Sequence, residues 1–144
     1  MDQVTWRLQI RGHVARELVL TYDDLLSRPS SVTRALLDCT GGWFTRQDWQ
    51  GVHISTLLAE ARVLDEARSL IVKSVTGYDR RFRLDDADRL LLALQVAGEP
   101  LSPVHGFPAR LVAPGRRGYN WVKWVQSVEV SGDPPVLQPP LPLQ

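Results

Sequence analysis

The stretch LLDCTGGWFTRQDWQGV, residues 36–52, is the most informative part of this chain. It contains Cys39, the single cysteine among 144 residues, which follows an apolar run and precedes a Gly-Gly pair and two tryptophans. One cysteine excludes an internal disulfide, so three roles remain open: a buried structural thiol, a nucleophile or a metal ligand.

The residues around Cys39 bear differently on the two reactive roles. A nucleophilic cysteine needs a histidine or asparagine partner, and no local signature of a thiol protease or transferase surrounds it. Without a second cysteine or a histidine at ligand spacing, the segment cannot form a zinc site. It can still give one thiolate to a metal that an organic cofactor holds, and the adjacent glycines would let the backbone approach such a cofactor closely.

The composition bounds the possible classes of protein. A length of 144 residues with 44% hydrophobic residues suits one domain with an ordinary core. The net charge of +1 gives no global field that would favour nucleic acid. No apolar run approaches the ~18 residues of a membrane span, and the N-terminus lacks the features of a signal peptide. We therefore expect no nucleic-acid partner, no transmembrane segment in this chain and, by default, a cytoplasmic location.

Local patterns predict many strands and several short helices, which is typical of an α+β fold with mixed or antiparallel sheets. A capping box from Thr21 to Asp24 predicts a helix over 21–26, and Ser55 is the expected N-cap of a second helix over 55–61. A third short helix is expected over 85–91. The expected strands are 6–10, 17–20, 32–39, 69–75, a strand after the turn at Gly77, 91–96, 109–114 and 126–130. We expect one domain over residues 1–131 and a Pro-rich tail over 132–144.

A second informative stretch is HGFPARLVAPGRRGYNWVKW, residues 105–124. Arg110, Arg116, Arg117 and Lys123 lie here among glycines and prolines. Guanidinium and ammonium groups beside exposed backbone N–H groups can hold a phosphate, although a basic glycine-rich loop can also be a solvated turn.

Taken together, these stretches resemble the molybdopterin-binding domain of the sulfite oxidase superfamily. The segments DCTGGW…DWQGVHISTLLAEA, SVTGYDRRF and GEPLSPVHGFPARLVAPGRRGYNWVKWVQSVEV follow the order of the family over roughly residues 6–130. The DCTGGW segment is similar to a bacterial branch whose members are often found beside, or fused to, membrane cytochromes.

The resemblance implies a set of cofactor contacts. Cys39 matches the catalytic cysteine whose thiolate binds molybdenum, and a soft thiolate suits this metal. Other positions match residues that contact the pterin or its phosphate: Thr76, His105, Arg110, Trp121, Val122 and Lys123. Trp43 and Phe44 are expected to wall the pocket, whereas Trp49 is expected in the core.

The implied function is a molybdenum-cofactor oxidoreductase that moves two electrons, with oxygen-atom transfer, between a small substrate and a cytochrome partner. Relatives are often periplasmic or membrane-associated. Sulfite oxidases have arginines just after the cysteine, whereas TGGWF fills those positions here. We therefore expect a substrate other than sulfite, such as an organic sulfoxide or N-oxide. The alternative is a non-catalytic binding module without cofactor, because relatives have a cofactor-contacting loop before the first strand and this sequence begins almost at that strand.

Overall fold

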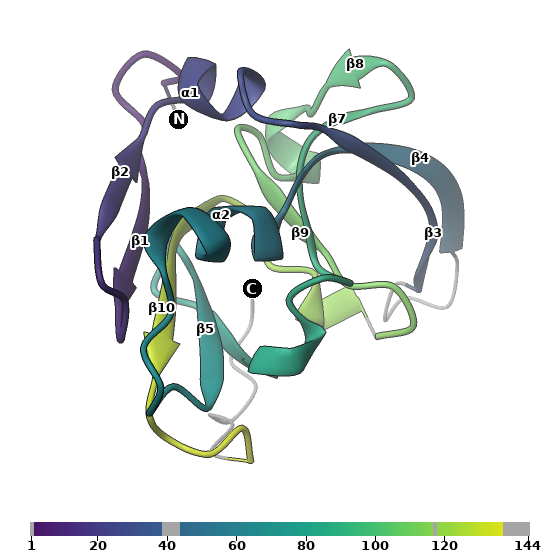
Figure 1. Ribbon diagram of the computed structural model, residues 1–144. Coiled ribbons are helices and arrows are strands. Elements are labelled where there is room, and N and C mark those ends of the chain that lie inside the picture. Colours follow the sequence, from purple (N-terminus) through teal and green to yellow (C-terminus); the bar gives the residue numbers. More distant parts are fainter. Residues whose placement is uncertain (1, 39–43, 117, 137–144) are drawn as a thin grey trace.

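The computed structural model describes residues 2–38, 44–116 and 118–136, whose strands form two sheets (Figure 1). The first sheet has the order β2-β1-β10-β5-β6, and the second has the order β3-β4-β7-β8 with β9 paired to β7. The strands of the first sheet are β1 (Leu8–Gly12), β2 (Leu18–Leu20), β5 (Ser69–Ser74), β6 (Asp79–Arg83) and β10 (Val125–Ser131). Those of the second are β3 (Ser31–Asp38), β4 (Phe44–His53), β7 (Leu91–Val96), β8 (Glu99–Pro100) and β9 (Arg110–Val112).

Short helices connect these strands, and the expected α+β class is confirmed. The helices are α1 (Tyr22–Leu26), α2 (Ile54–Ala61) and the 3-10 turns η1 (Leu84–Asp86), η2 (Pro103–His105) and η3 (Gly118–Asn120). Strand β1 pairs in parallel with β10, while the other strand pairs of the described residues are antiparallel. The first sheet is therefore mixed and the second is antiparallel, in line with the expected mixed or antiparallel sheets.

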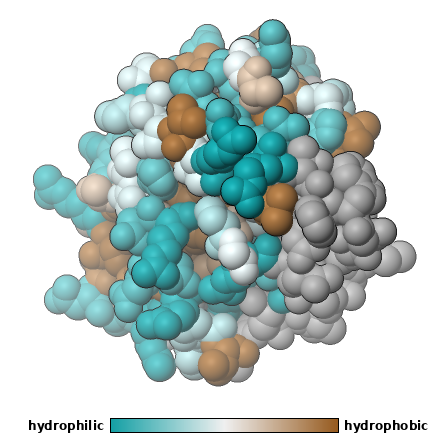
Figure 2. Space-filling model, turned by 90° about the vertical axis from the view of Figure 1, so that its right-hand side faces the viewer, coloured by the Kyte–Doolittle hydropathy of each residue, from teal (hydrophilic) through white to brown (hydrophobic). Residues whose placement is uncertain are grey.

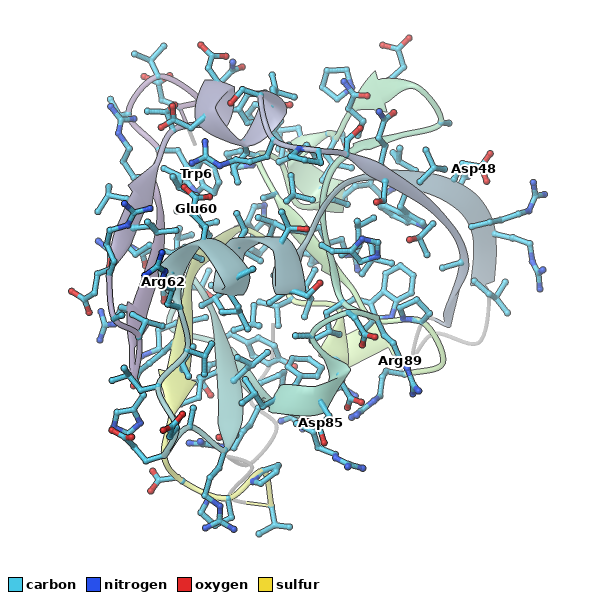
Figure 3. The ribbon with its side chains drawn as sticks, in the orientation of Figure 1. Trp6, Asp48, Glu60, Arg62, Asp85 and Arg89 are labelled. Carbon is cyan, nitrogen blue, oxygen red and sulfur yellow. The ribbon has the colours of Figure 1, made fainter. Side chains whose placement is uncertain are left out.

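The predicted capping box of the first helix is present. The Thr21 hydroxyl accepts the Asp24 N–H, and the Asp24 carboxylate accepts the Thr21 N–H, both at 2.9 Å. Just beyond the helix, Arg28 forms a two-pronged contact with Glu60 of α2, with N–O distances of 2.7 and 3.2 Å. Glu60 lies on the side of α2 that faces α1 (Figure 3), so this ion pair ties the two helices together.

The predicted cap of the second helix is wrong. His53 takes the N-cap position of α2, and no side chain caps the helix. The backbone supplies the acceptors instead, because the N–H groups of Ile54 and Ser55 donate to the carbonyls of Leu90 and Ala87 at 2.9 and 3.1 Å. The helix expected over 85–91 is also wrong: only η1 forms there, and the buried leucines 90 and 91 lead directly into β7.

Strand β4 is the main element that local patterns did not predict. It pairs with β3 from Phe44 to Gly51 and with β7 from Trp49 to His53. Trp49 is 2% exposed and lies in the core, as expected. The pairing with β7 shifts register at Gln50 and Gly51, where a Cβ on Gly51 would lie 1.9 Å from the Leu92 carbonyl oxygen. Only glycine fits this bulge, which bends β4 over the core.

Both sheets share one hydrophobic core that extends along β1, β10, β7 and α2. Trp6 closes one side of it, since its indole N–H donates to the Val125 carbonyl at 3.0 Å. Within the described ranges, no helix combines the length and the apolar character that a membrane crossing requires.

Candidate functional site

The segments that carry the expected cofactor contacts meet in space. The Leu111 N–H donates to the Val122 carbonyl at 2.8 Å, and the Val125 N–H donates to the Ala109 carbonyl at 3.0 Å. The turn after β5 joins them, because the Val75 N–H donates to the Trp124 carbonyl at 2.9 Å. Residues 74–76, 105–112 and 121–125 therefore form one cluster, the "clamp". Cys39 lies outside the described residues, and so does Trp43.

Arg110 is the most enclosed cation of the clamp. Arg110 is only 6% exposed, and its guanidinium carbon lies 5.9 Å from the ring centres of both Trp49 and Trp121. One terminal nitrogen donates to the His105 carbonyl at 3.2 Å. Stacking on aromatic faces favours the planar guanidinium over an ammonium group. Both faces of β9 are buried, so Arg110 is held inside the protein rather than on an open face.

Gly106 makes room for the two cations of the clamp. It follows η2 in the left-handed region, with φ of +115°, and its N–H donates to the Pro103 carbonyl at 3.2 Å. A Cβ at this position would lie 2.9 Å from Cβ of Arg110 and 3.3 Å from Cγ of Lys123. The stems of both basic side chains thus pass against the bare backbone of this turn, which places two positive charges beside it.

Lys123 and Trp124 fix the other side of the turn. The Lys123 ammonium lies 4.9 Å from the centre of the Trp124 ring, within the range of a cation–π contact. The Trp124 indole N–H donates to the Pro103 carbonyl at 2.8 Å, which anchors η2 to the strand β10 that follows Trp124.

His105 lies at the end of η2 and is exposed. Its ring nitrogen Nδ1 is 2.6 Å from the hydroxyl oxygen of Ser102, which is also the N-cap of η2. Sequence reasoning did not single out Ser102. The signal was a serine directly before a proline, the pair that favours an N-cap followed by the first helical position.

The remaining expected contacts differ in environment. Thr76 is exposed, and its hydroxyl donates to the Ser74 hydroxyl at 3.1 Å. Trp121 and Val122 are fully buried; the Trp121 indole donates to the Ala113 carbonyl at 2.9 Å and its ring meets Trp49 edge-on at 5.5 Å. Contact of these residues with a cofactor stays a prediction.

Arg116 separates from the clamp although it belongs to the same basic loop. It pairs with Asp86 at 3.1 Å and lies 5.6 Å from the ring centre of Phe82. It also lines an open pocket of about 350 Å³ together with Arg34 and Arg46 of strands β3 and β4. The described part of the face seen in Figure 2 is mainly polar, with scattered apolar side chains. Asp48, next along the exposed side of β4, points outward there (Figure 3).

The clamp brings together the expected cofactor contacts that lie in the described residues, and comparison with known proteins shows the family of the chain. The family "Oxidoreductase molybdopterin binding domain" matches residues 1–136. The chain belongs to this family.

Two relatives of this chain are longer proteins. It is 34% identical over 132 residues to "Uncharacterized oxidoreductase YuiH" of Bacillus subtilis (strain 168), covering 89% of this chain and 66% of the relative. It is also similar to a chain of the sulfane dehydrogenase SoxCD from Paracoccus pantotrophus, with 32% identity and a TM-score of 0.88. That match covers 92% of this chain and 40% of the SoxCD chain. The sequence thus corresponds to part of the length of both relatives.

The described residues fit a molybdopterin cofactor. Arg110 and Lys123 bring two positive charges to a turn that glycine leaves open, which suits the phosphate of such a cofactor. Beside them, the buried indole N–H of Trp49 has no hydrogen-bond partner among the described residues. A buried donor of this kind is costly unless something accepts from it, so it is a further group suited to an acceptor-rich ligand.

Proposed function

We propose that this domain is a molybdenum-cofactor oxidoreductase that catalyses two-electron, oxygen-atom transfer on a small substrate and exchanges electrons with a cytochrome partner. The observation that carries the proposal is the clamp, in which His105, Arg110 and Lys123 surround the turn at Gly106. Family membership supports the cofactor, and the names of the two relatives, an oxidoreductase and a dehydrogenase, support redox chemistry.

The protein groups have distinct tasks in this proposal. Arg110 and Lys123 offset the negative charge of the cofactor phosphate, and His105 donates a hydrogen bond beside them. The rings of Trp49 and Trp121 fix the orientation of the Arg110 guanidinium, so the side chain loses little conformational entropy when the phosphate binds. Cys39 contributes the thiolate that completes the coordination of the metal. The cofactor, when bound, supplies the redox chemistry.

Sulfite is not the substrate in this proposal. The positions directly after Cys39 carry no cation, and Arg46, the next guanidinium along the chain, is exposed on β4 opposite Leu36. Recognition of a small oxyanion at the metal needs paired guanidinium groups or comparable donors. A less charged substrate, such as an organic sulfoxide or N-oxide, fits these residues better.

Metal analysis tests the function directly. Protein produced in a host that makes the cofactor should contain about one molybdenum per chain, and Cys39→Ala and Cys39→Ser should abolish the metal-centred absorbance. Ser31→Ala, at the start of the strand that leads to Cys39, is the matched control and should leave both unchanged. Equal molybdenum in wild type and Cys39→Ala would refute the ligand assignment. Folded wild-type protein without molybdenum from such a host would favour the non-catalytic module.

The loaded protein then tests the substrate. Sulfite with an artificial electron acceptor should give little turnover, whereas sulfoxides with a reduced viologen donor should be reduced. Sulfite oxidation at the usual enzymatic rates of about 1–10³ per second, lost on Arg46→Ala, would refute this choice of substrate.

A further inference from the structure

We propose that Ser102 is a positioning residue for His105: its hydroxyl donates to Nδ1 of the imidazole and so fixes the neutral ring in the tautomer that carries its proton on Nε2. The contact is short, with 2.6 Å between Oγ of Ser102 and Nδ1 of His105. The identity of the group that Nε2 then serves rests on the proposed function, whereas the tautomer itself does not.

Hydrogen bonds to the backbone fix the turn that carries the two side chains. Ser102 begins η2 and Gly106 ends it, so the serine and the histidine share one turn. The N–H groups of His105 and Phe107 both donate to the Ser102 carbonyl at 3.0 Å. The Trp124 indole holds the same turn from the side through the Pro103 carbonyl. The hydroxyl and the imidazole therefore meet because the turn is closed.

The other contact of the Ser102 hydroxyl, with a backbone N–H that is shared with the Ser102 carbonyl, favours one direction of the bond. A serine hydroxyl has one donor hydrogen and can accept through its lone pairs. Its oxygen already accepts the backbone N–H of His105 at 3.3 Å. When the hydroxyl hydrogen points to Nδ1, one N–H group donates to the oxygen and the oxygen donates onward, so both side chains are satisfied. The opposite tautomer would direct two N–H groups of one residue at the same oxygen.

As a consequence of this tautomer, the turn presents hydrogen-bond donors. With Nδ1 occupied by Ser102, the neutral ring offers an N–H group at Nε2 and no acceptor. Arg110 donates to the carbonyl of the same histidine at 3.2 Å, and Lys123 passes against Gly106. Ser102 thus gives the imidazole the same donor character as its two cationic neighbours.

Nitrogen NMR of the cofactor-free protein tests the proposal. Long-range ¹H–¹⁵N spectra distinguish the tautomers of a neutral imidazole, so they are recorded at about pH 9, above the ~6.5 at which histidine ordinarily titrates. The chain has three histidines, and His105→Gln identifies the signals of His105. We expect roughly tenfold more Nε2–H than Nδ1–H, the ratio that one ordinary hydrogen bond supports.

Three substitutions of Ser102 separate the role in positioning from the role as a cap. Ser102→Thr keeps cap and donor and should retain the ratio. Ser102→Ala should bring the two tautomers to within a few fold of each other. Ser102→Asp keeps the cap but can only accept, so it should reverse the preference to Nδ1–H. Backbone spectra confirm that each variant keeps the fold. An unchanged tautomer in Ser102→Ala and Ser102→Asp, or Nδ1–H as the main form of the wild type, would overturn the proposal.

The loaded protein shows whether the tautomer matters for the ligand. Ser102→Ala should release molybdenum cofactor about 2- to 10-fold faster than wild type, the value of one hydrogen bond. In a His105→Gln background the same substitution should have no further effect. An equal effect in both backgrounds would overturn the proposal, because Ser102 would then act without His105. Failure of the wild type to bind cofactor would instead refute the proposed function, and the NMR result would still decide the role of Ser102.

Discussion

Replacing Arg110 should destabilise the protein even when no cofactor is bound. The family resemblance alone leads to another expectation, in which Arg110 faces the pocket and its loss affects cofactor retention only. The structure places Arg110 in the interior, beside the edge-on pair of rings of Trp49 and Trp121 and against the His105 carbonyl. Its removal therefore takes away packing, ring contacts and a hydrogen bond at once.

The contacts give the size of the effect. Two cation–π contacts at 5.9 Å lie near the outer limit of that interaction, so together they contribute roughly 1–2 kcal/mol. The hydrogen bond to the His105 carbonyl adds about 1 kcal/mol, because water can replace it at an exposed residue. Truncation of the buried stem adds about 1 kcal/mol more. Arg110→Ala should thus lower the free energy of unfolding by about 3–4 kcal/mol and the midpoint of thermal unfolding by roughly 9–15 °C.

Urea unfolding of cofactor-free protein measures this directly. Arg34→Ala is the matched control, since Arg34 is also a strand residue but its side chain is 68% exposed and pairs with Asp48 only at 3.7 Å. The control should change the free energy of unfolding by less than about 0.5 kcal/mol. If Arg110→Ala were as stable as the control while its cofactor dissociated faster, the argument from the two tryptophans would be refuted.

Two further predictions concern the turn at Gly106 and the pair that joins α1 to α2. Gly106→Ala should weaken cofactor retention and lower the free energy of unfolding by about 2–4 kcal/mol, because φ is positive and the new methyl group meets Arg110. Gly98→Ala is the control, since Gly98 also has a positive φ but faces open space. This control should lower the free energy of unfolding only by the backbone strain of about 1–2 kcal/mol. The contact with Arg28 lowers the pKa of the Glu60 carboxyl. The stability that this shift contributes is present above the ordinary pKa of 4.5 and is lost as the pH falls through the lower pKa of the folded state. Urea titrations should therefore show Glu60→Gln less stable than wild type at pH 7, with a smaller difference at about pH 3; a difference that does not depend on pH would contradict this.

Local patterns predicted those elements whose causes are local. The capping box of Thr21 and Asp24 needs only four residues, and the strand β5 is a compact run of β-branched and apolar side chains. The strand β4 was not predicted because polar residues lie on both of its sides, as in the run from Arg46 to Asp48, so the alternation of a half-buried strand is missing. Its buried Trp49 also finds its partner far along the chain. The cap of α2 failed for a similar reason, since backbone carbonyls of residues 87 and 90 replace a side chain.

The candidate site also has features that the sequence predicted and features that depend on the folded structure. The motif in residues 105–124 indicated which residues belong to the clamp, and the structure shows residues 105–112 and 121–125 side by side. It did not show that Arg110 is enclosed while Arg116 turns away to Asp86, because this depends on which strand lies next to each. The place of Ser102 followed only from the geometry of η2.

The parallel pairing of β1 with β10 has a consequence for how the chain can be made. Gln9 to Gly12 lie beside Ser127 to Val130, so this edge of the early strand β1 is paired only when synthesis has reached β10. Until then β1 and β5, which β10 separates, each have an unpaired edge that can pair with another molecule. Contacts between such distant parts of a sequence also slow folding. Because residues 121–125 of the clamp lead directly into β10, the site and the first sheet are completed together, so a cofactor meets its full set of protein contacts only after synthesis has reached this strand.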